Sequence, residues 1–182
     1  MQYLKTGSNH VAVASGPMAE AVADSTQHLR DEDLYAIAAY LKNLPGSNIR
    51  NPQLLKATGT LMQQGANVYS ANCSACHNSD GKGINQLASS LTGNPGIQAD
   101  NAQSLITTVL EGGRGAVTVD NPASGTMPSF AWKLSDQQIP ATLSYIRNSW
   151  RNAAPEVTAK RVAEVCEHRK LPAHLSADGS SR

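Results

Sequence analysis

One pentapeptide constrains this chain more than any other feature, Cys73-Ser74-Ala75-Cys76-His77. The pattern Cys-x-x-Cys-His is the attachment site of c-type haem. Cysteines three residues apart at the end of a helix lie on one face, so each can form a thioether to a haem vinyl group, and the next histidine can reach the iron. The motif therefore predicts one covalent haem c, held by Cys73 and Cys76, with His77 as an axial ligand.

Two other uses of a Cys-x-x-Cys pair fit this sequence less well. A structural zinc site needs a second pair of Cys or His ligands at suitable spacing, and the remaining cysteine, Cys166, stands alone far along the chain. A thioredoxin-like redox pair follows a strand in an alternating pattern of strands and helices, whereas residues 60–72 have helical periodicity. Both alternatives are therefore disfavoured.

The second axial ligand has to come from another part of the chain. Haem electron carriers use Met or a second His there. Met127 is the favoured candidate, because Pro128 keeps it in an extended loop that cannot collapse into a helix. The alternative is that Met127 only fills a gap in the core. The remaining candidates are Met62 on a predicted helix, the terminal Met1, and His168 and His174 in a polar tail.

The composition suits a small protein that holds a large apolar group. Only 4% of the residues are aromatic, so a haem would supply bulk that the side chains lack. The 15 Lys and Arg nearly balance 14 Asp and Glu and are scattered among them, which argues against a nucleic-acid partner. No apolar run is long enough to span a membrane, and residues 1–5 have no apolar signal-peptide core.

Residues 60–72 predict the helix that leads into the attachment motif. Their apolar residues recur at helical spacing, and Thr60 and Gln63 match a capping box at the start. Gly65 lies within the apolar stripe. Opposite a large residue such as Tyr145, a glycine lets two helices cross closely, so we expect this helix to pack against the last helix of the domain.

Two further amphipathic segments complete the predicted fold. One helix is expected from about residue 100 to the glycine pair 112–113. The next is expected from Ser135, capped by Gln138 and with Trp150 on its inner face, although Pro140 should kink or delay its first turn. Three helices, with the haem motif after the first and a methionine loop before the last, are the plan of an all-α cytochrome c fold.

The C-terminal part of the chain resembles a more particular family. The residues that carry the resemblance are Gly125-Thr126-Met127-Pro128-Ser129-Phe130-Ala131-Trp132-Lys133-Leu134-Ser135-Asp136 and Tyr145-Ile146-Arg147-Asn148-Ser149-Trp150. They resemble the last haem domain of the three-haem cytochrome c subunit of membrane-bound bacterial dehydrogenases for alcohols, aldehydes or gluconate. The resemblance implies electron transfer from a dehydrogenase catalytic subunit towards ubiquinone or an oxidase. It also implies a place on the periplasmic side of the inner membrane, with membrane association through the complex.

The N-terminal segment resembles the closing half of the second haem domain of that family. The matching residues are Tyr3-Leu4-Lys5-Thr6-Gly7, Gly16-Pro17-Met18-Ala19-Glu20-Ala21-Val22 and Asp33-Leu34-Tyr35-Ala36-Ile37-Ala38-Ala39-Tyr40-Leu41-Lys42. The resemblance makes Met18 that domain's axial ligand. The core face of its last helix would be Leu34, Ile37, Ala38 and Leu41. Because the sequence has no second Cys-x-x-Cys-His, Met18 is expected to lack a haem within this chain.

These observations divide the chain into four parts. Residues 1–45 are expected to be the C-terminal half of a cytochrome c domain without its attachment motif, 46–58 a linker, 59–151 a cytochrome c domain with one haem c, and 152–182 an amphipathic to disordered tail. In the tail, Val162, Val165 and Cys166 form a thin apolar stripe. A solvated terminal helix is favoured over docking on a partner or a membrane surface, and residues 171–182 are expected to be disordered.

Two positions depart from the family pattern, and one arginine is a further candidate. The family has a proline where Ser89 or Ser90 stands here, and the carbonyl group nearby helps to orient the ligating histidine, so that contact is left open. Arg151 replaces a usual glycine, a small change at a helix end. Arg114 could neutralise a haem propionate; a solvated loop arginine is the equal alternative.

The proposed ligand set predicts the class of function. An iron with both His77 and Met127 as ligands has no open position for a substrate, so we expect electron transfer and no catalysis by this chain alone. A haem peroxidase needs an open iron site and a distal acid or base, and a haem-based sensor needs an output domain. Two alternatives stay open, a stand-alone soluble electron carrier and a truncated fragment that does not mature, since no export signal is visible.

Overall fold

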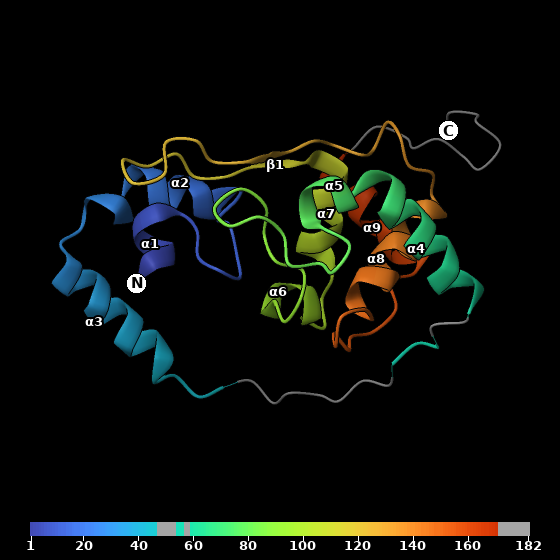
Figure 1. Cartoon of the computed structure of the whole chain (residues 1–182), viewed down its shortest axis with the longest axis horizontal. Coiled ribbons are helices and arrows are strands. Elements are labelled where there is room, and N and C mark those ends of the chain that lie inside the picture. The colour runs from blue at the N-terminus through green and yellow to red at the C-terminus, as the bar shows by residue number, and fades with distance from the viewer. Residues whose placement is uncertain (47–53, 57–58, 171–182) are drawn as a thin grey trace.

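The computed structural model describes residues 1–46, 54–56 and 59–170, and its regular structure is almost entirely helical (Figure 1). The N-terminal elements are α1 (Gln2–Thr6), α2 (Pro17–Asp24), the 3₁₀ helix η1 (Thr26–His28) and α3 (Asp31–Lys42). The later helices are α4 (Thr60–Asn72), α5 (Ser74–His77), α6 (Pro95–Gln98), α7 (Gln103–Glu111), α8 (Gln138–Arg147) and α9 (Ala159–Arg169). Two short antiparallel strands, β1 (Gly113–Arg114) and β2 (Thr126–Met127), pair between α7 and α8. The predicted all-α class is confirmed.

Helices α4 and α8 cross closely at Gly65. A Cβ atom at this position would collide with the carbonyl oxygen of Ala141 and would lie 2.6 Å from the Cβ of Tyr145. Any larger residue would push the two helices apart, because the distance between packed helices depends on the side chains at their contact. The predicted approach of Gly65 and Tyr145 is therefore confirmed, and it fixes the direction in which α4 delivers Cys73.

A glycine precedes α4, an asparagine caps the start of α7, and a glycine ends α7. Gly59 occupies the N-cap of α4 without a side-chain bond, so the predicted capping box at Thr60 was wrong. At α7, the side-chain oxygen of Asn101 accepts from the N–H of Gln103 at 2.9 Å. Gly112 ends α7 with a φ of 78°, a left-handed conformation that glycine adopts without steric cost. The predicted helix stop at the glycine pair is confirmed.

Helix α8 begins later than its capping residues suggest. The predicted reciprocal cap is present: the Ser135 N–H donates to Oε1 of Gln138 at 3.0 Å, and the Gln138 N–H donates to Oγ of Ser135 at 3.3 Å. The regular helix starts only at Gln138, since Pro140 has no N–H and is tolerated in a first turn. Trp150 lies beyond the end of α8 with a φ of 52°, so its expected place on a helix face was wrong.

Helix α9 packs on the rest of the protein. Val162 and Val165 are each 2% exposed and belong to one apolar cluster with residues of α7 and α8. Arg169 forms two hydrogen bonds with Glu111 of α7, at 2.7 and 2.8 Å. The expected solvated tail helix was therefore wrong, because burial of each valine stabilises the docked helix by roughly 1.5–3 kcal/mol. The predicted disorder of residues 171–182 lies outside the described residues.

The N-terminal elements form an apolar cluster together with the chain between β1 and β2. Its members are Ala14, Val22 and Ala116, with Tyr3, Met18 and Ala19 packed around them. Figure 1 shows α1, α2 and α3 gathered at one end of the molecule, with the chain between β1 and β2 reaching across to them. Within α3, Leu34 is buried but Leu41 is 54% exposed. The predicted core face of this helix is therefore covered only in part.

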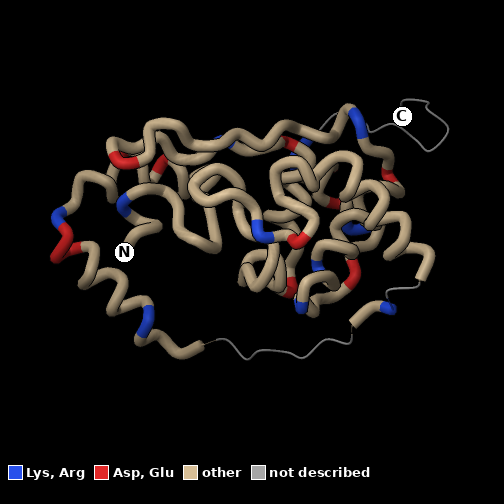
Figure 2. Tube along the Cα trace, viewed as in Figure 1, with Lys and Arg blue, Asp and Glu red and all other residues tan. Residues whose placement is uncertain are grey.

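The surface of the described residues mixes both signs of charge. Lys and Arg are interspersed with Asp and Glu along the trace (Figure 2). Lys82 pairs with Asp80 at 2.8 Å, and Arg30 pairs with Asp33 at 3.2 Å. Within the described ranges, no helix combines the length and the apolar character that a membrane crossing requires.

Candidate haem site

The attachment motif lies where α4 passes into the short helix α5. Cys73 caps α4, and its N–H donates to the carbonyl of Tyr69 at 2.8 Å. The next turn is closed by the N–H groups of Cys76 and His77, which both donate to the carbonyl of Cys73, at 3.2 and 3.0 Å. The helical turn therefore sets the spacing of the three motif side chains. Both thiols are free, as thioether attachment requires.

An open cavity of about 240 Å³ lies against this turn. Cys73, Cys76, His77 and Met127 all line it, although Met127 comes from a distant segment. The other lining residues are mostly small or apolar, among them Leu87, Ala88, Gly113, Gly125, Pro128 and Phe130. The structure thus brings the two predicted attachment cysteines and both predicted iron ligands to one apolar cavity. This donor set fits a haem c, an apolar ring held between an imidazole and a thioether.

A backbone carbonyl orients the imidazole of His77. Its Nδ1 lies 3.0 Å from the carbonyl oxygen of Ser89. When Nδ1–H donates to this carbonyl, Nε2 carries the lone pair that binds iron. Burial lowers the pKa of His77, and the contact with Ser89 acts in the opposite direction. The lowered pKa favours neutral imidazole, the form that binds metal. The contact that the missing family proline left open is therefore present.

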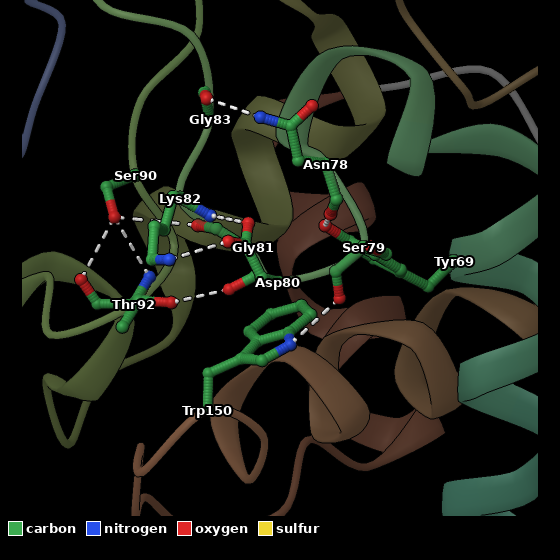
Figure 3. Close-up of polar contacts among 10 residues, drawn as sticks. All are labelled: Tyr69, Asn78, Ser79, Asp80, Gly81, Lys82, Gly83, Ser90, Thr92 and Trp150. Carbon is green, nitrogen blue, oxygen red and sulfur yellow. Dashed lines mark hydrogen bonds and ion pairs between the residues drawn. The ribbon is translucent and has the colours of Figure 1, made fainter.

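The loop that follows the motif is held by hydrogen bonds (Figure 3). The Tyr69 O–H donates to the carbonyl of Asn78 at 2.6 Å, and the Trp150 indole N–H donates to the carbonyl of Ser79 at 3.1 Å. Gly81, with a φ of 69°, lies so close to this indole that a Cβ would be 2.6 Å from its ring. Further bonds join Asn78 with Gly83, Thr92 with Asp80, and Ser90 with Gly81. The loop therefore has little freedom to move away from the cavity.

Met127 is held from two sides. In the strand pair it lies opposite Gly113, and a Cβ on Gly112 would be 2.5 Å from the Met127 carbonyl oxygen. Just beyond it, the hydroxyl of Ser129 donates to the carbonyl of Leu110 in α7 at 2.5 Å. The backbone on both sides of Met127 is thus tied to α7 and β1, which places the methionine at the cavity.

The Cys73 thiol lies in a poorly solvated place. Burial and the neighbouring Cys76 raise its pKa to about 11, with Lys133 acting in the opposite direction. The thiol is therefore protonated at neutral pH, and the environment suits an uncharged thioether better than a thiolate. Among the described residues, no three or more His, Cys, Asp and Glu side chains gather as a metal cluster would need.

Arg114 lies beside the cavity but does not line it. Its neighbours Gly113 and Gly115 are lining residues, whereas the Arg114 side chain is exposed. Two lining residues that the sequence analysis missed are Val13 and Ser15, from the N-terminal segment. No local pattern marks them, because their place depends on how two distant segments pack.

Known proteins settle the family. A model of the cytochrome c family matches residues 62–150, which run from α4 to just beyond α8. Cytochrome c-552 of Thermus thermophilus is 32% identical over 134 residues, which cover 69% of this chain and 89% of that protein. The chain belongs to the cytochrome c family. Membership of this family implies covalent haem c as the cofactor, as the motif predicted.

This cytochrome c is also similar to longer cytochrome subunits of dehydrogenases. It is 38% identical over 183 residues to the gluconate 2-dehydrogenase cytochrome c subunit of Pantoea cypripedii, covering 95% of this chain and 42% of the relative. It is 38% identical over 185 residues to the alcohol dehydrogenase (quinone) cytochrome c subunit of Gluconobacter oxydans, covering 97% of this chain and 38% of the relative. The chain thus spans about two fifths of these relatives, and the predicted resemblance is confirmed.

Proposed function

We propose that this cytochrome c carries one haem c, attached to Cys73 and Cys76, with His77 and Met127 as axial ligands. The observation that carries the proposal is that all four side chains line one apolar cavity. When bound, the haem supplies a reversible one-electron couple. The chain holds the ring, keeps the His77 imidazole neutral and oriented towards it, and positions the Met127 thioether through the β1–β2 pair.

The chain transfers electrons and transforms no substrate by itself. With both His77 and Met127 as ligands, a bound haem iron would have no open position for a reactant and would supply one-electron transfer only. Among the described residues, the cavity lining has no ionisable side chain apart from the motif cysteines and His77. A peroxidase would need a further acid or base on the open side of the iron.

The electron donor is a dehydrogenase catalytic subunit, and the acceptor is ubiquinone or an oxidase. The similarity to the cytochrome subunits of gluconate and alcohol dehydrogenases supports the donor, and the word quinone in the name of the second relative supports the acceptor. This role places the chain on the periplasmic side of the bacterial inner membrane, with membrane association through the complex.

The same relatives support the division of the chain into parts. Residues 59–151 form the haem domain, 1–45 are the closing half of a neighbouring cytochrome c domain, 46–58 link them, and 152–182 are the tail. The apolar cluster around Ala14 and Val22 draws most of its members from residues 1–45 and meets the haem domain at Ala116, as expected for a part that packs on the haem domain. Met18 packs at that cluster and is not among the residues that line the cavity. Met18 is therefore not proposed as a ligand of the haem at Cys73 and Cys76.

Haem stoichiometry tests the proposal directly. The chain is expressed behind a signal peptide in a host with haem-attachment machinery, and the covalent haem is quantified by mass and by absorption. We expect one haem per chain, and none when Cys73 and Cys76 are both replaced by serine. An oxidised spectrum with the weak near-infrared Met-to-iron band completes the expected result. Two haems per chain, or covalent haem in the double serine variant, would overturn the proposal.

A further inference from the structure

The N-terminal segment 9–15 is bonded to the loop that carries the histidine contact. The N–H of Val13 donates to the side-chain oxygen of Ser89 at 3.0 Å. Next to it, the side-chain amide of Asn94 donates to the carbonyl of Val11 at 3.3 Å. These two bonds join segment 9–15 to the loop on the His77 side of the cavity.

The same segment is bonded to the methionine side of the cavity. The N–H of Ala116 donates to the carbonyl of Ala14 at 3.2 Å, and Ser15 forms an antiparallel bridge with Gly115. Val13 and Ser15 themselves line the cavity. Segment 9–15 therefore spans the two walls that hold the predicted iron ligands.

A tight turn prepares the segment for this contact. The side-chain oxygen of Asn9 accepts from the N–H groups of Val11 and Ala12, at 2.9 and 2.8 Å. The Asn9 N–H in turn donates to the carbonyl of Ala12 at 2.9 Å. Such a turn is held by its own side chain, so the N–H of Val13 is presented in a fixed direction.

Ser89 joins the two networks within one residue. Its side chain accepts from Val13, and its carbonyl accepts from Nδ1 of His77. We propose that Ser89 is a positioning residue: its hydroxyl, held by segment 9–15, keeps the Ser89 carbonyl aligned with the imidazole of His77. This inference rests on the proposed ligation of haem by His77.

Close packing leaves the carbonyl little room to realign by other means. A Cβ on Gly83 would lie 2.5 Å from the Ser89 carbonyl oxygen, so Gly83 packs closely against this carbonyl. The side chain of Ser89 is held by the bond from Val13. Without that bond the loop opens more often, and each opening exposes Nδ1–H of His77 to exchange with water. The hydroxyl of Ser89 therefore slows exchange of the His77 Nδ1 proton with water, although the hydroxyl does not contact that proton.

The experiment measures exchange of the His77 Nδ1 proton by NMR in the haem-loaded, reduced protein. Ser89→Ala is compared with Ser89→Thr, which keeps a hydroxyl, and with Val13→Pro, which removes the donor. We expect exchange about fivefold faster in Ser89→Ala, the free-energy equivalent of one hydrogen bond, and near the original rate in Ser89→Thr. Ser104→Ala is the matched control, because Ser104 is an exposed residue of α7 and does not line the cavity.

A double-variant cycle separates positioning from general loosening. If the Val13–Ser89 bond is responsible, adding Ser89→Ala to Val13→Pro leaves the exchange rate unchanged. Unchanged exchange in Ser89→Ala, or additive effects in the double variant, would overturn the inference. If Ser89→Ala fails to retain haem, the inference is tested by Val13→Pro alone, in which the His77 Nδ1 proton should exchange faster than in the original protein. Haem stoichiometry and the near-infrared band are recorded in parallel, so a failure of the proposed haem ligation is distinguished from a failure of this inference.

Discussion

Arg147 donates from its Nη1 to the carbonyl oxygen of Ile97 at 3.0 Å, from a position that is 0% exposed. Its Nε donates to the carbonyl of Pro155, also at 3.0 Å. One side chain at the end of α8 thus ties α6 to the segment that leads into α9. Burial lowers the pKa of Arg147, and Asp100 acts in the opposite direction. The guanidinium stays charged at neutral pH, because its ordinary pKa is far higher.

Arg147→Lys should lower the free energy of unfolding by about 3 kcal/mol. Lysine cannot reach both carbonyls with one planar group, and hydrogen bonds to charged groups contribute about 1.5–3 kcal/mol each. Chemical unfolding of the haem-loaded protein, followed by circular dichroism, measures the change. Arg151→Lys is the matched control, since Arg151 is exposed. Equal stability of the two variants would show that the buried bonds contribute little.

Gly65→Ala should destabilise the protein by about 1–3 kcal/mol, the usual cost of overpacking. The new methyl group would collide with Ala141 and lie 2.6 Å from the Cβ of Tyr145, which outweighs the gain of about 1 kcal/mol in helix propensity. Unfolding by denaturant gives the change in free energy. Asn67→Ala, at an exposed position of the same helix, should stay within about 0.5 kcal/mol of the original. A stabilised Gly65→Ala variant would contradict the close crossing.

Met127→Ala should keep the covalent haem but lose the near-infrared Met-to-iron band. Its reduction potential should fall, because a methionine thioether raises the potential of haem iron. Met18→Ala should keep both the band and the potential, since Met18 packs at the N-terminal cluster. Absorption spectroscopy and a redox titration test both variants. The reverse pattern, with the band lost only in Met18→Ala, would refute the assignment of Met127.

Arg114→Gln should lower the reduction potential by less than about 59 mV, the one-electron equivalent of a tenfold change. A guanidinium near a propionate destabilises the oxidised, more positive haem. The exposure of Arg114 limits the effect, since solvent screens the charge. A redox titration compares this variant with Arg151→Gln, which should not shift. An unchanged potential in Arg114→Gln would show that Arg114 is a solvated loop residue and does not neutralise a haem propionate.

The docking of α9 should weaken in acid through Glu111. Hydrogen bonding and charge from Arg169 lower the pKa of Glu111 from its ordinary value of 4.5, and partial burial acts in the opposite direction. A carboxyl group with a lowered folded pKa stabilises the folded state fully above its unfolded pKa, and this contribution is lost as the pH falls through the folded pKa.

Unfolding free energies of the original protein and of Glu111→Gln, measured between pH 6 and pH 3, test this dependence. The difference between them should be largest near pH 6 and should shrink below about pH 4.5, in line with the unfolded pKa of glutamate. High salt should reduce it at every pH, because the pair is partly exposed. A difference that stays constant over this range would show that the ion pair does not couple to folding.

The haem motif, the methionine loop and the helical class could be predicted because each depends on residues that are close in the sequence. Cys73, Cys76 and His77 share one helical turn, and Pro128 restricts Met127 directly. The crossing at Gly65 was also predictable, since a glycine in an apolar helical stripe has few other uses. The position of Trp150 could not be predicted. Its backbone leaves the helix with a positive φ, and its ring packs against Tyr69 with the ring centroids 5.0 Å apart, a contact between distant segments.

By itself, the sequence determined the chemistry of attachment, the candidate ligands and the all-α class, because covalent reactivity and helical periodicity are local properties. Only the tertiary structure decided that Ser89 supplies the carbonyl to His77 and that Val13 and Ser15 complete the cavity wall. It also decided that α9 docks through Val165. These features depend on distances between segments that are remote along the chain. The packing of the whole chain sets those distances, and no short pattern of residues encodes them.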